Sequence, residues 1–114
     1  MNRIIHKELY ESGRWFKLSL IQQLANVGSD VERTIKWKNA GDLISSQQAF
    51  ERALELIDFI VLDPKNKGRL REVLRVREFF ADYIVGDNHY GFTDEAWQKY
   101  FRWFGFAAAR ERGR

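Results

Sequence analysis

The residues best suited to chemistry in this chain are basic and lie close together, between Lys65 and Arg77. Six Lys or Arg against a single acid, Glu72, occupy this segment: Lys65, Lys67, Arg69, Arg71, Arg75 and Arg77. Clustered cations bind phosphate groups by charge and by hydrogen bonds, so the segment predicts an anion-binding surface with RNA or DNA as the obvious partner. The alternative is a solvated helix face whose charges pair locally, for example Glu72 with Arg75.

A second candidate for chemistry is the loop that contains Asp87 and His89. A histidine beside a carboxylate can bind a metal ion or transfer a proton. The sequence has one other histidine, His6, no cysteine, and no Glu-x-x-His pair, glycine-rich phosphate loop or serine-nucleophile elbow. Loop polarity explains His89 better than catalysis does. We therefore expect a non-catalytic protein with no cofactor and no metal site.

Helices must position these residues, because apolar residues recur at helical spacing in four segments. The segments are about 14–38, 45–62, 65–85 and 94–110. Ser45 with Gln48 fits a capping box and is favoured over Asp42 as the start of the second helix. Thr93 is expected to cap the fourth. Gly41 and Pro64 mark the ends of the first and second.

Four amphipathic helices joined by short loops predict an all-α, antiparallel up-down-up-down four-helix bundle over residues 14–110. A short N-terminal arm, residues 1–13, precedes it, and a basic tail, residues 111–114, follows it. The sequence does not decide whether the arm is helical or extended. In this topology one end of the bundle gathers cations from all four helices, a set we call the basic pole: Arg14, Lys17, Lys65, Lys67, Arg69, Arg71, Arg110, Arg112 and Arg114.

One face of the first predicted helix lies opposite its apolar stripe and still carries two tryptophans. Its residues are Trp15, Leu18, Gln22, Asn26, Arg33 and Trp37. Trp and Arg are typical anchors of protein interfaces, so this face predicts a contact with a second subunit. The alternative is that the N-terminal arm folds over Trp15 while Trp37 rests on a loop. The sequence leaves both interpretations open.

Two residues interrupt the apolar stripes. Arg77 falls in the apolar arc of the third helix, which predicts a packed stem whose head pairs with an acid, either Asp58 or one on a neighbouring subunit. Ligand binding by Arg77 is the alternative. Gly28 lies on the stripe of the first helix, where a glycine is tolerated if another backbone packs close to it.

Composition limits the classes of protein further. A chain of 114 residues with 45% hydrophobic and 15% aromatic residues is expected to form one folded domain. It has no apolar run long enough to cross a bilayer, and Glu8 and Glu11 fall where a signal peptide would be apolar. We expect a soluble, cytoplasmic protein. The net charge of +3 is small, so the placement of the charges matters more than their sum.

The four-helix pattern and the basic third helix resemble small bacterial four-helix-bundle families. The nearest in architecture are the ribosomal-RNA intervening-sequence proteins and the accessory variability proteins of diversity-generating retroelements. The segments RWFKLSLIQQLANVGSDVER and DPKNKGRLREVLRVRE also look like an uncharacterised bacterial family. The named relatives imply a ring-forming homo-oligomer that associates with nucleic acid, and they supply no residue that transfers by motif.

Three functional hypotheses follow from the sequence. The first is a non-catalytic accessory protein that self-associates and binds the phosphates of RNA or DNA through the basic pole. The second is a protein-interaction or oligomerisation module that uses the Trp15 and Trp37 face and has no nucleic-acid role. The third, ranked last, is an enzyme that uses His89 with Asp87.

Overall fold

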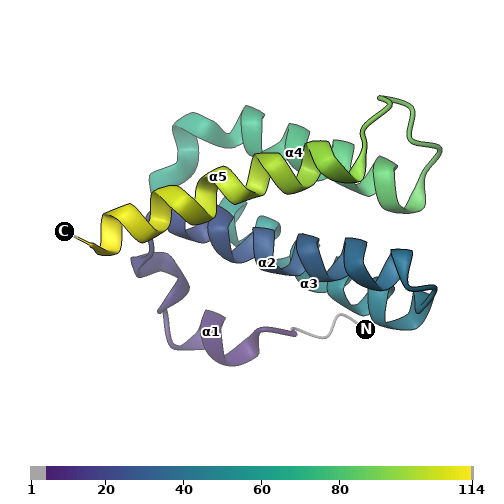
Figure 1. Cartoon of the computed structure of the whole chain (residues 1–114). Helices are drawn as coiled ribbons and strands as arrows, with labels where there is room; N and C mark the ends of the chain where they lie inside the picture. The colour runs from purple at the N-terminus through teal and green to yellow at the C-terminus, as the bar shows by residue number, and fades with distance from the viewer. Residues whose placement is uncertain (1–4, 114) are drawn as a thin grey trace.

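The structure, a computed structural model, describes residues 5–113, and over this range it contains helices and loops but no strand (Figure 1). The elements in order are α1 (Lys7–Glu11), η1 (Trp15–Lys17), α2 (Leu20–Asn39), α3 (Leu43–Leu62), η2 (Pro64–Arg69), α4 (Leu70–Val85) and α5 (Asp94–Arg112), where η denotes a 3₁₀ turn. The predicted all-helical class is confirmed, and four long helices, α2 to α5, pack together. No described helix combines the length and apolar character needed to span a membrane.

The first long helix begins later than predicted, at Leu20 rather than Arg14. Ser19 and Gln22 form a reciprocal capping box: the Ser19 hydroxyl accepts from the Gln22 amide at 3.1 Å, and Gln22 Oε1 accepts from the Ser19 amide at 3.0 Å. Leu18 is extended, so the turn Trp15–Lys17 is separated from the helix. The prediction of one continuous helix over residues 14–38 is therefore wrong at its start.

The other helix ends agree with some of the predicted capping signals and differ from others. Asp42 caps α3 through a 3.0 Å hydrogen bond from the Ser45 amide, so the predicted start at Ser45 is wrong. Thr93 caps α5 as predicted, accepting from the Ala96 amide at 3.1 Å. Gly41 ends α2 with a φ of +82°, also as predicted. Pro64 ends α3 and opens η2, which delays the third long helix to Leu70.

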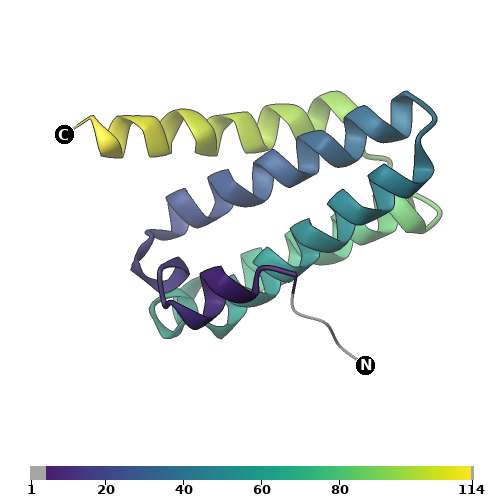
Figure 2. The ribbon, with the colours of Figure 1, turned by 90° about the horizontal axis from the view of Figure 1, so that it is seen from below.

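Helix α2 is the centre of the fold and packs against α3. At one end the Ser46 hydroxyl donates to the Thr34 carbonyl at 2.9 Å, and at the other Gln23 Nε2 donates to Asp63 Oδ2 at 2.9 Å. Figure 2 shows the two helices as a hairpin beside each other. These two contacts fix the register of α2 against α3 at both ends.

Helix α5 also packs along α2. Glu111 accepts from the Ser19 hydroxyl at 2.7 Å near the start of α2, and Asp94 accepts from Lys38 at 2.9 Å near its end. The hydroxyl group of Tyr83 in α4 also donates a hydrogen bond to Asp94. The end of α2, the end of α4 and the start of α5 are therefore joined at one carboxylate.

Helix α4 lies against α3, where the rings of Phe50 and Phe80 are 5.6 Å apart. The backbone of α4 lies farther from α5 than the backbone of α2 does. Aromatic side chains fill the space between α4 and α5. Phe80 meets Trp97 at 5.3 Å between ring centroids, and Phe79 meets Phe92 at 5.6 Å. This wider spacing between α4 and α5 leaves room for a cleft.

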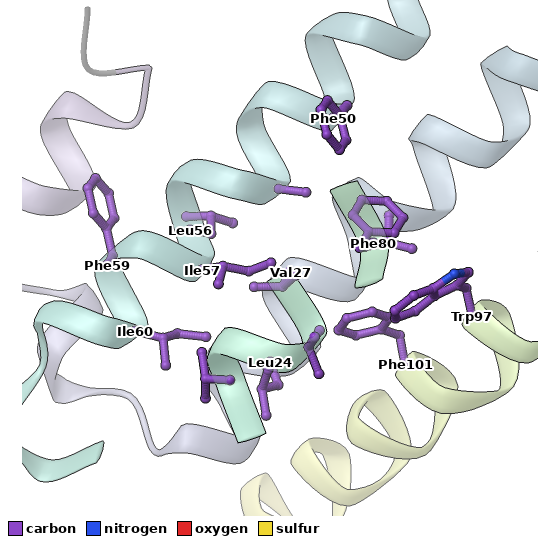
Figure 3. Packing of buried hydrophobic residues seen from close by; sticks show 14 of the residues in the cluster. Leu24, Val27, Phe50, Leu56, Ile57, Phe59, Ile60, Phe80, Trp97 and Phe101 are labelled. Atoms are coloured by element: carbon purple, nitrogen blue, oxygen red, sulfur yellow. The ribbon is translucent and has the colours of Figure 1, made fainter. Parts of the chain in front are cut away.

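The hydrophobic core lies among α2, α3, α4 and α5, as Figure 3 shows. Labelled members of the cluster are Leu24, Val27, Phe50, Leu56, Ile57, Phe59, Ile60, Phe80, Trp97 and Phe101. Trp97 stacks on Phe101 one turn later in α5, with ring planes 22° apart. Trp97 and Phe101 thus form the wall of the core on the α5 side.

Candidate nucleic-acid interface

A buried polar network holds together the end of the molecule that carries the basic pole. Asn66 Nδ2 donates to Gln23 Oε1 at 2.8 Å and to the Ile60 carbonyl at 3.1 Å. Gln23 Nε2 in turn donates to Asp63 Oδ2 at 2.9 Å and to the Trp15 carbonyl at 3.1 Å. The network ties η1, α2, α3 and η2 to one another, so it positions the basic residues of both turns.

Several residues of the basic pole lie at this end. Lys65 Nζ donates to the carbonyl of Phe16 at 3.2 Å, which places the start of η2 beside η1 and Lys17. Arg112 lines a shallow cavity with Leu18, so the end of α5 lies beside the start of α2. The structure thus brings cations from distant parts of the sequence to one end. Arg114 lies outside the described residues.

Acids neutralise part of this charge. Arg14 pairs with Glu8 at 3.2 Å, Arg69 pairs with Glu72 at 2.5 Å, and Lys65 pairs with Asp63. Within residues 5–113, ten Lys or Arg side chains have no acid at ion-pair distance. Five belong to the basic pole, namely Lys17, Lys67, Arg71, Arg110 and Arg112; the others are Arg75 of α4, Lys36, Arg52, Lys99 and Arg102. The unpaired cations, rather than all the cations predicted, are the ones available to an anionic partner.

A cleft of about 520 Å³ adjoins the basic residues of η2 and α4. It lies between α4 and α5 and is lined by Gly68, Arg69, Arg71, Glu72, Arg75, Val76, Phe79, Phe92, Ala96, Trp97 and Tyr100. Arginines thus share this cleft with aromatic and aliphatic side chains. Arg69 and Arg71 were predicted to belong to an anion-binding surface, whereas the aromatic residues of the cleft were not predicted, because they come from α4, the loop before α5 and α5 itself.

The charges in the cleft favour an anion over a cation. The Glu72 carboxylate, both by accepting a hydrogen bond and by its charge, raises the pKa of Arg69, and the pair leaves little net charge. Burial raises the pKa of Tyr100; Glu72 adds to the rise and Arg69 opposes it. The phenol of Tyr100 is therefore neutral at physiological pH. Arg71 and Arg75 supply the net positive charge of the cleft.

The predicted tryptophan interface is not an exposed face. Trp15 is fully buried, because it belongs to η1 and not to α2, and its ring lies 6.4 Å from that of Phe59. Tyr10 of the arm packs against Phe59 as well, at 5.0 Å. Assigning Trp15 to a subunit interface is therefore wrong, and the arm covers this region instead. Trp37 is half-buried, with Lys36 Nζ 5.3 Å from its ring centroid.

The remaining residues of that face do not form a continuous apolar surface. Gln22 caps α2, and Asn26 is exposed and donates to the carbonyl of Gln22 at 2.9 Å. Arg33 pairs with the buried Asp30 at 2.7 Å. Leu18 is half-buried beside the end of α5. These contacts are internal to the chain.

Arg77 has the partner that the sequence suggested. Its Nε donates to Asp58 Oδ1 at 2.8 Å. The two side chains are 37% and 51% exposed, so the pair lies on the surface and not inside the apolar arc. An exposed pair of this kind contributes between about 0 and 1 kcal/mol.

The loop of Asp87 and His89 shows no organised site. Both residues are exposed, and over residues 5–113 no hydrogen bond or ion pair joins them. Over the same range no group of three His, Asp or Glu side chains is placed to hold a metal ion.

Comparisons with protein-family models, with curated proteins and with solved structures find no match to this chain.

Proposed function

We propose that this chain is a non-catalytic helical protein that binds the phosphates of RNA or DNA through its basic pole. The observation that carries the proposal is the set of unpaired cations around η1, η2 and the start of α4, beside the end of α5. Each of these side chains can neutralise one phosphate, and the affinity for nucleic acid rises with the number of such contacts.

The regular up-down-up-down bundle is part of this proposal. It is supported by the antiparallel contacts of α2 with α3 and of α2 with α5. It is supported also by the pairing of Arg77 in α4 with Asp58 in α3. With this topology the ends of α3 and α5 and the starts of α2 and α4 meet, which is the arrangement that concentrates the cations.

The experiment is a titration of labelled RNA and DNA with the wild type and with a Lys67→Glu, Arg71→Glu variant, followed by fluorescence anisotropy. Wild-type affinity should fall on the order of 100-fold or more between 50 and 200 mM salt. The variant should bind far more weakly, with a salt slope smaller by about 2. Circular dichroism should show the same helix content for both proteins.

A Lys36→Glu, Lys99→Glu variant is the matched control, because it changes the net charge equally and alters exposed residues outside the pole. It should retain most of the affinity. Equal affinity of the wild type and the Lys67→Glu, Arg71→Glu variant at every salt concentration would reject the proposal.

We propose self-association as a second function, on a different surface from the one the sequence suggested. Trp103 and Phe106 of α5 are 59% and 67% exposed and lie near each other along one shallow apolar hollow. Exposed aromatic side chains of this size are typical of interfaces. Light scattering tests this: a Trp103→Ser, Phe106→Ser variant should fall to the monomer mass of 13.6 kDa, whereas Trp37→Ser should not. A wild type that is already monomeric would reject it.

A further inference from the structure

We infer that the cleft between α4 and α5 binds an unpaired nucleobase while Arg71 and Arg75 hold the adjoining phosphates, so that the ligand is a single-stranded nucleic acid. This inference rests on the proposed function, and it names the class of nucleic acid that the site selects.

The size and lining of the cleft fit a flat, largely apolar group. Its volume of about 520 Å³ lies within the range of pockets that take small ligands. Phe79, Phe92, Trp97 and Tyr100 contribute aromatic rings to the lining. Nucleobases stack on such rings whatever their identity, because every base has a π-face. Bases within a duplex are already stacked and paired, so they do not present a free face to a side pocket.

The charges of the cleft select an anionic ligand. Arg71 and Arg75 are four residues apart on α4 and therefore lie on the same side of the helix, at the cleft. The acid in the lining, Glu72, is paired with Arg69 at 2.5 Å, so its charge is compensated. An apolar floor next to two unpaired guanidinium groups matches a base attached to a phosphodiester. An apolar helix in the cleft would leave both charges without a partner.

The cleft is also continuous with the basic pole. Gly68 and Arg69 of η2 contribute to its lining, and Lys67 immediately precedes them. A strand whose base enters the cleft can therefore continue its backbone toward Lys67. This continuity explains how one ligand can use both the aromatic cleft and the cations of η2.

The test compares three probes at 50 mM salt: single-stranded RNA, single-stranded DNA of the same sequence, and the DNA duplex with an equal number of phosphates. The wild type should bind at least one of the single strands about tenfold more tightly than the duplex. A Tyr100→Leu variant keeps an apolar side chain but removes the ring. It should lose about tenfold in affinity for the single strand and bind the duplex unchanged.

Tyr10→Leu is the matched control, since it makes the same substitution in the N-terminal arm, outside the cleft. Phe92→Leu is a second cleft variant, should Tyr100→Leu fail to fold, and it should show the same selective loss. Comparing the affinities for single-stranded RNA and single-stranded DNA shows which of the two the protein prefers. Tighter binding of either single strand than of the duplex supports the inference. Equal, salt-sensitive binding of duplex and single strands would overturn it and leave the proposed function standing. Failure of all three probes to bind would reject both.

Discussion

Gly28 of α2 lies against Phe101 of α5 so closely that a Cβ atom at position 28 would be 2.9 Å from the Cβ of Phe101. The sequence predicted close packing at Gly28, and the structure identifies α5 as the neighbour. Because the nearest atom is a Cβ fixed to the α5 backbone, it cannot move aside as the tip of a flexible side chain would. The absence of a side chain at position 28 thus sets the separation of α2 and α5.

Gly28→Ala should therefore destabilise the protein, although alanine is the better helix former by about 1 kcal/mol. The added methyl group must push α5 away, and overpacking of this kind costs about 1–3 kcal/mol. Chemical denaturation followed by circular dichroism measures the difference. Gly105→Ala is the control, since it lies in α5 with no atom within 4 Å of an added Cβ, and it should stabilise by up to about 1 kcal/mol. Equal effects of the two substitutions would contradict this account.

The network around Gln23 should be as important to stability as a large apolar residue. Gln23→Leu keeps the approximate volume but removes one hydrogen bond each from Asn66, Asp63 and the Trp15 carbonyl, all at a buried site. We expect a loss of about 2–4 kcal/mol in the free energy of unfolding. The control Gln47→Leu, at an exposed site of α3, should change it by less than about 0.5 kcal/mol. A similar small effect at position 23 would show that the network is dispensable.

The carboxyl group of Asp63 should make the folded protein less stable as the pH falls. Burial acts to raise the pKa of Asp63, but hydrogen bonds from Lys65 and Gln23 outweigh it and hold the pKa below its ordinary value of 3.8. A carboxyl group with a lowered folded-state pKa stabilises the protein above its unfolded pKa, and this contribution is lost as the pH falls through the folded value. In Asp63→Asn, the difference in unfolding free energy between pH 7 and pH 3 should therefore be smaller than in the wild type.

Asp30 supplies a control of opposite sign. Burial raises the pKa of Asp30 above 3.8, with Arg33 and His6 opposing the rise. Protonation of Asp30 therefore favours the folded state as the pH falls, and this offsets part of the acid destabilisation. Asp30→Asn should make the loss of stability between pH 7 and pH 3 steeper than in the wild type. Denaturant titrations at the two pH values measure both variants, and changes of the same sign in both would refute the assignment.

Local signals were sufficient to predict the helical class and several boundaries. Gly41, Pro64 and Thr93 act through backbone geometry and capping within a few residues, so their effects could be read from the sequence. The start of α2 was missed because the apolar spacing of Phe16 and Leu20 continues across the break, although Ser19 and Gln22 form a capping-box pattern that marks it.

The parts of the site that depend on distant contacts escaped prediction. Asn66 and Gln23 are 43 positions apart, and nothing in either neighbourhood indicates that one satisfies the other. The cleft likewise depends on the distance between α4 and α5, which the packing of Phe80 against Trp97 determines. Helix periodicity places a residue on a face, but it does not give the distance from that face to its neighbour.

The start of the described N-terminal arm makes three polar contacts with one carboxylate of α3. Glu55 of α3 accepts from the amides of Ile5 at 2.8 Å and His6 at 2.6 Å, and its Oε1 lies 2.8 Å from Nδ1 of the His6 ring. Helix α1 has no fully buried residue, although Leu9 packs against the core and Tyr10 against Phe59, so the polar contacts of Glu55 add to partial burial in holding the arm.

Glu55→Ala should therefore release the arm and leave the four long helices folded. Without the Glu55 carboxylate, the amides of Ile5 and His6 and the His6 imidazole have only water as a hydrogen-bond partner. We therefore expect trypsin to cleave after Lys7 several times faster than in the wild type. The free energy of unfolding should fall by no more than about 1–3 kcal/mol, since the core lies elsewhere. Glu51→Ala, one turn earlier on α3 at an exposed position, is the control and should leave both measurements unchanged. If cleavage after Lys7 were equally fast in wild type and Glu55→Ala, other contacts, such as that of Tyr10 with Phe59, would hold the arm.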